Sequence, residues 1–206
     1  MYEYQYEGEG NVEVFEALAT RRSIRKFMNK PINAAQLNDI VEVAKLYPNP
    51  ANLQPMRFVI LNQREQCEPV LQLLRWAGYI SDYEIKDDNQ PAAMILLFGD
   101  REKAKDFGFS TGAAATYIML AAHAMGIASC CLGVSQASKI YEVVGIDPSH
   151  YEFQCLVALG YPGQTARTVD QSGSCKYYLD DQGNFVVPKR KNTEIILGNW
   201  SMDSRE

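Results

Sequence analysis

Histidine is scarce in this chain of 206 residues, which contains only His123 and His150. A His-rich metal site, or catalysis that depends on a histidine relay, is therefore disfavoured. No Cys-x-x-Cys pair occurs, and the number of cysteines is odd, which argues against a disulfide framework or a zinc ribbon. We interpret the adjacent Cys130 and Cys131 as small apolar residues of a buried strand. The other cysteines are Cys67, Cys155 and Cys175.

Phosphate-binding glycine motifs and an excess of positive charge are also absent. Neither G-x-G-x-x-G nor G-x-x-x-x-G-K-[ST] occurs, so the sequence shows no built-in dinucleotide site and no P-loop. The formal net charge of -5 excludes a globally basic protein that coats nucleic acid, although a local basic patch remains possible. We expect no metal and no nucleic-acid partner.

The sequence shows no targeting segment, and we predict no membrane span. The first residues are acidic and aromatic rather than basic and then apolar, so we expect no signal peptide and a cytoplasmic protein. Residues 107–138 lack charge over a length that could span a membrane. Small residues dominate this run and Gly126 interrupts it, so we predict a buried helix, a turn and a buried strand, and no membrane partner.

The composition is that of an ordinary globular domain, with 47% hydrophobic and 22% charged residues. No linker-like tract divides the chain, so we expect a single domain over residues 1–206 with a core at about 12–197. Helical periodicity is seen near 12–20 after Asn11, 34–46 after Asn33, 66–76, 110–125 after Ser110, and 136–144 after Ser135.

Strand patterns alternate with these helices. They cover 58–61, 94–98, 127–132 and 155–159, and a hairpin joins 177–179 to 185–187. A last helical turn is expected at 194–197. The sum is an α+β fold with a central four- to five-stranded mixed sheet surrounded by helices.

A first segment that can carry chemistry comprises Arg21, Arg22, Ser23 and Arg25, just where the first helix ends. Guanidinium groups match the geometry of a phosphate, and a serine hydroxyl adds a donor. Such a cluster can hold a phosphate monoester and a second electron-rich group. Taken alone, the pattern fits a solvated basic turn at least as well.

A second segment is the loop at 48–55, in which Pro48 and Pro50 restrict the backbone. Asn49, Asn52 and Gln54 then present amides, which both donate and accept hydrogen bonds and suit the edge of a planar heterocycle. An ordinary helix-to-strand connection is the alternative.

Two further places are weaker signals. The strand near Leu132 ends at Gly133, where a backbone N–H can approach a ligand closely. A late basic pair, Lys189 and Arg190, can close on the same phosphate. A plain strand end and solvated charge are the alternatives.

Taken together and in this order, these segments resemble the FMN-dependent nitroreductase family. The likeness covers roughly residues 12–197 and is carried by 21–27, 48–55, 126–133, 158–163 and 187–190. It implies a domain-intertwined homodimer with FMN at the interface. Hydride then passes from NAD(P)H through FMN to a nitroaromatic, quinone or similar electron-poor molecule in a ping-pong cycle.

The resemblance also implies roles for particular residues. Arg21, Arg22, Ser23 and Arg25 match the segment that grips the phosphate, ribityl chain and pyrimidine edge of FMN. Pro48, Asn49, Pro50, Asn52 and Gln54 match the loop that reaches the flavin from the partner subunit. Leu132 and Gly133 match the backbone that meets flavin N5, and Lys189 and Arg190 match the late phosphate contact. FMN carries the chemistry, so no catalytic side chain is expected.

The sequence departs from the family at Cys131, where many relatives have an aromatic residue, and at Val134, where many have a second glycine. These departures keep open a flavin-storage or flavin-sensing protein without turnover. A relative that cleaves a carbon–halogen bond or the flavin itself is a further alternative. Residues 76–90 match a variable lid and receive no substrate role. A nucleic-acid module is the remaining rival, and the net charge of -5 counts against it.

Overall fold

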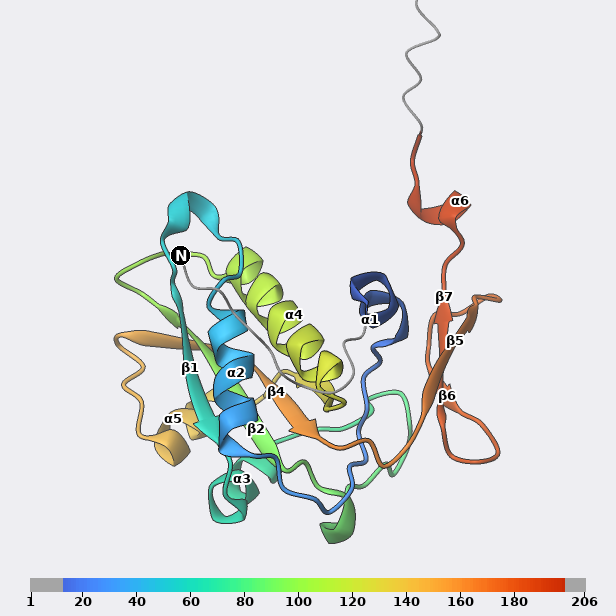
Figure 1. Cartoon of the computed structure of the whole chain (residues 1–206), viewed down its shortest axis with the longest axis horizontal. Coiled ribbons are helices and arrows are strands. Elements are labelled where there is room, and N and C mark those ends of the chain that lie inside the picture. The colour runs from blue at the N-terminus through green and yellow to red at the C-terminus, as the bar shows by residue number, and fades with distance from the viewer. Residues whose placement is uncertain (1–12, 199–206) are drawn as a thin grey trace, which may run out of the picture. The chain divides into compact units, whose positions relative to one another are not determined.

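The computed structural model describes residues 13–198, which divide into two compact units. The first unit contains the chain up to Ala77 together with Tyr83–Gln164, and the second contains Gly78–Asp82 and the chain from Thr165 onward. Figure 1 shows the elements of both units in the order in which they follow along the chain. Within the described residues, no helix is both long and apolar enough to cross a membrane.

A four-stranded sheet forms the centre of the first unit. Its strands are β1 (Met56–Leu61), β2 (Ala93–Asp100), β3 (Ala128–Leu132) and β4 (Tyr151–Gly160), in the spatial order β1-β2-β4-β3. All neighbouring pairs are antiparallel, so β1 and β3 are the two edges of the sheet. Every residue of β2 is buried, which means that both faces of the sheet are covered.

Helices α2 (Ala34–Ala44) and α4 (Gly108–Ala124) pack on one face of this sheet. Leu37 and Ile40 of α2 and Ile118 of α4 join one apolar cluster with Ile95 and Val157 of the strands. Helices α3 (Arg64–Leu71) and α5 (Ala137–Val144) contact each other, and they contact β2 and β4, respectively. Short 3-10 turns, η1 (Pro50–Asn52) and η2 (Asp87–Asn89), lie in the connections.

Helix α1 (Val14–Thr20) contacts α4 but leaves most of its apolar surface uncovered within the described chain. Ala17 is buried, whereas Val14 is 70% exposed, Phe15 is 87% exposed and Leu18 is 53% exposed. A helix with this pattern normally places its apolar side against another protein surface.

The second unit is a small three-stranded sheet. Strand β7 (Phe185–Lys189) lies between β5 (Ala166–Asp170), with which it is parallel, and β6 (Tyr178–Leu179), with which it is antiparallel. The tight turn between β6 and β7 is closed by a 2.9 Å hydrogen bond from the Asp180 N–H to the Asn184 carbonyl. The short helix α6 (Asn192–Ile195) follows.

The expected α+β class and the predicted hairpin are confirmed. The central sheet, which was expected to be mixed, is four-stranded, and all pairs of its strands are antiparallel. Asn33 caps α2, since its Oδ1 accepts a 2.9 Å hydrogen bond from the Ala35 N–H. The helix expected at 66–76 was placed wrongly, because α3 begins at Arg64 and ends at Leu71. Strand β5 was not predicted. The proposed cap Asn11 lies outside the described residues.

Two other predicted caps were wrong. Ser110 lies inside the first turn of α4, which begins after Phe107, and the N-cap of α5 is Gln136 rather than Ser135. Leu46 was assigned to the apolar stripe of α2 but lies beyond the end of that helix and is 68% exposed.

Candidate cofactor site

The arginine segment at 21–25 runs along the outer edge of β3. The Ile24 N–H donates a 3.0 Å hydrogen bond to the Ser129 carbonyl, and Ser23 forms a parallel bridge with Ser129. Ile24 and Phe27 are buried and anchor this stretch by their apolar side chains, whereas the flanking arginines are half-buried. The fold therefore holds polar side chains of this segment at the rim of the sheet.

Positive charge is concentrated in this segment without full compensation. The Nη1 of Arg21 is buried and has no hydrogen-bond partner among the described residues. Burial, and then the charge of Arg22, lower the pKa of Arg21 from its usual value. Arg22 Nη1 donates to the backbone carbonyl of Arg21 over 2.7 Å. An anion bound here would satisfy Arg21 and offset this repulsion.

The end of β3 lies beside the same arginines. The charge of Arg21 acts on both Cys130 and Cys131, and Gly133 follows directly after the strand. A Cβ placed on Gly133 would meet nothing within 4 Å, so the backbone there faces open space. Leu132 is half-buried at the last position of the strand. The structure thus brings together two segments that the sequence singled out separately.

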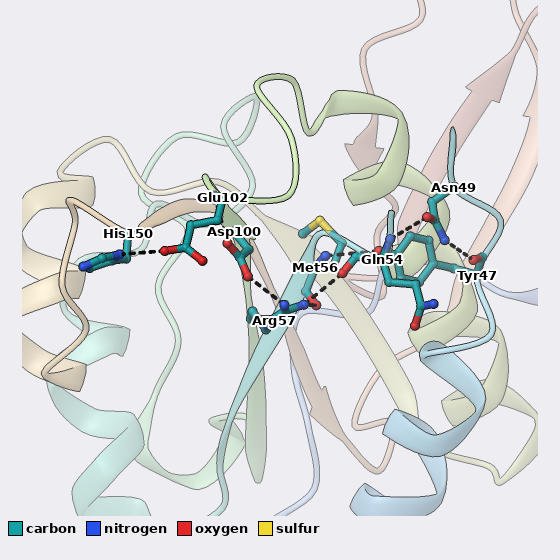
Figure 2. A network of polar contacts seen from close by, with 8 residues as sticks. All are labelled: Tyr47, Asn49, Gln54, Met56, Arg57, Asp100, Glu102 and His150. Atoms are coloured by element: carbon teal, nitrogen blue, oxygen red, sulfur yellow. Dashed lines mark hydrogen bonds and ion pairs between the residues drawn. The ribbon is translucent and has the colours of Figure 1, made fainter. Parts of the chain in front are cut away.

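The loop at 48–54 is built differently from the expectation that all of its amides face outward. Figure 2 shows that Asn49 is used inside the loop: its Nδ2 donates to the Tyr47 carbonyl over 3.2 Å and its Oδ1 accepts from the Gln54 N–H over 2.7 Å. Asn52 and Gln54 are exposed, as are Pro48 and Pro50. Ala51, Asn52 and Gln54 have positive φ angles, so the loop is sharply folded.

The same network ties the loop to β1. The Tyr47 hydroxyl accepts a 3.1 Å hydrogen bond from the Met56 N–H, and Arg57 Nη1 donates to the Gln54 carbonyl over 2.9 Å. The other end of the Arg57 guanidinium forms a 2.6 Å ion pair with Asp100 on β2. The loop is therefore a rigid platform, and its exposed side-chain amides are those of Asn52 and Gln54, the latter donating a 3.5 Å hydrogen bond to the Asn52 carbonyl.

The arginine segment and this loop lie at opposite edges of the central sheet. The first borders β3 and the second leads directly into β1, with β4 and β2 between the two edges. Two strands therefore separate the two segments within one chain.

The late basic pair belongs to the second unit. Lys189 is the last residue of β7, and its carbonyl accepts a 2.7 Å hydrogen bond from the Gln171 N–H. Both Lys189 and Arg190 are exposed. The structure places this pair within its own unit only.

A tyrosine from the predicted lid lies next to the arginine segment. The Tyr83 hydroxyl donates a 3.3 Å hydrogen bond to Gln164 Oε1, and Lys26 Nζ lies 5.7 Å from the centre of the Tyr83 ring. Burial raises the pKa of Tyr83 to about 12, and the charge of Arg25 opposes this shift. Gln164 Nε2 is buried without a partner among the described residues. Nothing in the local sequence pattern reveals this pair.

His123, near the end of helix α4, also borders the arginines. Its Nε2 lies 2.9 Å from Thr20 Oγ1, and the Thr20 hydroxyl donates to the Glu16 carbonyl. Burial lowers the pKa of His123, and the charges of Arg21 and Arg22 lower it further. His123 is therefore electrostatically coupled to the candidate anion site.

Comparison with known proteins then decides the family. The model of the nitroreductase family matches residues 18–161 of the chain. This chain is a member of the nitroreductase family. The family consists of FMN-dependent oxidoreductases, and the resemblance inferred from the sequence is confirmed.

Individual relatives of this nitroreductase-family protein agree. A protein of Methanothermobacter thermautotrophicus, provisionally named NADH dehydrogenase/NAD(P)H nitroreductase, shares 26% identity over 174 residues, which cover 82% of this chain and 87% of the relative. A protein of Archaeoglobus fulgidus with the same provisional name shares 28% identity over 158 residues, which cover 73% of this chain and 86% of the relative.

Solved structures show the same fold. The crystal structure of a provisionally named nitroreductase from Desulfovibrio desulfuricans, in complex with FMN, matches with a TM-score of 0.69 at 24% identity and covers 92% of this chain and 98% of that chain. An FMN-dependent nitroreductase from Clostridium difficile R20291 matches with a TM-score of 0.63 at 25% identity, covering 73% of this chain and 88% of that one. The nitroreductase fold of this chain therefore rests on nearly its whole length.

Proposed function

We propose that this protein is an FMN-dependent NAD(P)H oxidoreductase that reduces nitroaromatics, quinones or similar electron-poor small molecules. The observation that carries the proposal is the buried, unpartnered Nη1 of Arg21, in a cluster of three arginines beside the open backbone at Gly133. Family membership supports the cofactor, since relatives of known structure are complexes with FMN.

The residues present fit FMN. A phosphate dianion would satisfy Arg21 Nη1 and relieve the repulsion between Arg21 and Arg22. The open space at Gly133 would admit a flat ring close to the backbone, because no side chain occupies it. Ser23 adds a hydroxyl donor between the arginines. When bound, FMN supplies the hydride chemistry, so the chain itself needs no nucleophile and no metal.

The side chains around the ring would tune that chemistry. Arg25 and Lys26 lie near Tyr83, and positive charge at the pyrimidine edge would stabilise the negative charge of reduced flavin. Tyr83 is protonated at neutral pH, so its hydroxyl is a donor there, and burial, which raises its pKa to about 12, extends this to more alkaline pH. These residues bind and orient, and none of them takes part in a covalent step.

We infer a homodimer from the separation of the two candidate segments. The arginine segment borders β3, and the 48–54 loop leads into β1 at the other edge, so each flavin would receive Arg21–Arg25 from one chain and Asn52 and Gln54 from its partner. The exposed apolar residues Val14, Phe15 and Leu18 of α1 offer surface for such an interface.

The experiment that tests the function begins with the absorbance spectrum of the purified protein. Flavin bands, together with steady NAD(P)H oxidation that depends on an added nitroaromatic or quinone, would support the proposal. Alternating reduction by NAD(P)H and reoxidation by the acceptor, with parallel lines in double-reciprocal plots, would support the ping-pong cycle. Protein that stays colourless after incubation with FMN would overturn it. Bound flavin without turnover would indicate the storage or sensing alternative.

A further inference from the structure

Two thiols lie side by side on one face of the central sheet. Cys131 is directly opposite Val157 in the β3–β4 register, so Cys155 is its diagonal neighbour on the same face. Cys131 is exposed near the end of β3, whereas Cys155 is only 8% exposed. Both are free thiols.

The two thiols are chemically unequal. A hydrogen bond between their side chains lowers the pKa of Cys131, and Arg21 lowers it further against the opposing effect of burial. The same hydrogen bond raises the pKa of Cys155. The Cys155 S–H therefore donates to the Cys131 sulfur, which favours ionisation of Cys131 over ionisation of Cys155.

The next residue in the strand shows the contrast. Cys130 points to the opposite face, is 1% exposed, and has a pKa raised to about 11 by burial. The adjacent thiols Cys130 and Cys131 thus differ in solvent exposure and in the direction in which their pKa is shifted. Ser129 shares the face of Cys131, and its buried hydroxyl has no hydrogen-bond partner among the described residues. The Cys131 thiol and the Ser129 hydroxyl therefore lie on one face of β3, and the charge of Arg21 acts on that thiol.

We propose that Cys131 is a nucleophilic thiol, positioned by Cys155 and Arg21, that takes soft carbon electrophiles of the quinone and α,β-unsaturated carbonyl class. The Cys131 thiolate forms a C–S bond to the β-carbon of the electrophile, and the C=C π bond breaks. Its electron pair moves to the carbonyl oxygen, and a proton from water completes the adduct. No oxidant or reductant is consumed. The reaction needs only residues of this chain and does not require FMN.

The test is a competition between cysteines within one molecule. The protein as purified is treated at pH 7 with less than one equivalent of N-ethylmaleimide, quenched, digested with trypsin and examined by mass spectrometry. Cys130 and Cys131 fall in the peptide 106–139, Cys155 in 140–167 and Cys175 in 168–176. Fragmentation separates Cys130 from Cys131. The exposed Cys175 is the internal reference.

We expect the adduct on Cys131 at least about fivefold faster than on Cys175, because thiolate fraction and access together set the rate. Labelling of Cys131 no faster than Cys175, or an adduct mainly on Cys130, would overturn the proposal. Both results come from the unmodified protein and do not depend on any variant folding.

A substitution tests the positioning by Cys155. Cys155→Ala removes the S–H donor and should slow labelling of Cys131 by about threefold or more, while Cys155→Ser keeps a donor and should restore most of the rate. Cys67→Ala is the matched control, because Cys67 is also buried but donates to the Leu61 carbonyl, far from β3 in the chain. An unchanged Cys131 rate in folded Cys155→Ala would remove Cys155 from the proposal.

Discussion

The Ile24 N–H donates a 3.0 Å hydrogen bond to the carbonyl oxygen of Ser129. This bond ties the arginine segment to the strand that ends beside Gly133, although the two are far apart in the sequence. Because the tie is made by backbone atoms, it uses none of the polar atoms of the arginine side chains. The candidate site is thus pre-formed by the fold of one chain, at least along its β3 side.

Arg21 should contribute to FMN affinity without contributing to stability. Arg21→Gln removes a half-buried charge whose buried Nη1 has no hydrogen-bond partner among the described residues, so the apoprotein should unfold at the same or a higher temperature. FMN affinity should fall by about tenfold to a hundredfold, as expected for the loss of a charge-assisted hydrogen bond. Quenching of FMN fluorescence measures affinity, and a thermal scan of the apoprotein measures stability.

Arg64→Gln is the matched control for that substitution. Arg64 is 55% exposed and lies 3.9 Å from Asp87, so its loss should change neither quantity measurably. If both variants bind FMN equally well, Arg21 does not hold the phosphate.

Gly133 should matter only when FMN is present. The Gly133→Ala methyl group would meet no atom within 4 Å in the structure, so the apoprotein should keep its stability. FMN affinity should fall by at least about tenfold, because the methyl group occupies the space through which a flat ring approaches the backbone. Isothermal titration with FMN and thermal unfolding of the apoprotein separate the two effects.

Gly160→Ala provides the opposite case. Its methyl group would lie 2.7 Å from the Phe27 ring, so overpacking should cost about 1–3 kcal/mol of unfolding free energy. Full FMN affinity in Gly133→Ala would refute the close approach of the flavin at that residue.

The fold was largely readable from the sequence where local chemistry and tertiary packing agree. Asn33 caps α2 through its own side chain, and Gly126 ends α4 with a φ of 71°, so both signals report the backbone directly. Ser110 was wrongly predicted as a cap. Helix α4 begins earlier, after Phe107, and Ser110 is a buried residue of its first turn. Strand β5 was not predicted because no residue of Ala166–Asp170 is fully buried, so the segment lacks the alternation of buried and exposed residues that indicates a strand.

Of the candidate site, only those parts that are continuous segments of the sequence could be predicted. Arginine clusters and glycine strand ends stand out in the sequence, and β3 brings two such parts together. The contacts that Tyr83, Gln164 and His123 make at the site could not be predicted, because each contact joins residues that are far apart in the sequence. The internal use of the Asn49 amide was equally invisible, since a loop sequence does not show which amides close the loop.

His123 should make the apoprotein less stable as pH falls. The folded chain holds its pKa below the ordinary 6.5, by burial and by Arg21 and Arg22, whereas the nearby Glu16 acts in the opposite direction. Above pH 6.5 the ring is neutral in both states, so the full stability is present. Below it, the unfolded chain takes up the proton first, and stability is lost until the folded chain is protonated too.

His123→Gln should therefore reduce the drop in melting temperature between pH 7.5 and pH 5.5. His150→Gln replaces the other histidine of the chain and is the matched control. An equal reduction in both variants would contradict the role of His123. Bound FMN should also reduce the drop in the unsubstituted protein, since its phosphate would offset the charges of Arg21 and Arg22.

The opposite-edge placement of the two candidate segments predicts complementation between damaged chains. One chain carries Arg21→Gln and the other carries Asn52→Gly with Gln54→Gly, in which glycine retains the positive φ angles of these positions. Each homodimer should bind FMN weakly, because both of its sites lack one contribution. In the heterodimer, one site collects both defects, whereas the other combines an intact arginine segment with an intact loop.

The heterodimer, isolated with two different affinity tags, should therefore bind one FMN per dimer at nearly the affinity of the unsubstituted protein. The outcome distinguishes two arrangements. If both segments served the same flavin from within one chain, each site of the heterodimer would carry one defect, and tight binding would not return. If the loop did not touch FMN at all, the Asn52→Gly, Gln54→Gly homodimer would already bind two FMN tightly. Only a site shared across the two chains gives weak homodimers and a half-loaded, tight heterodimer, because only then do the defects separate into one broken and one intact site.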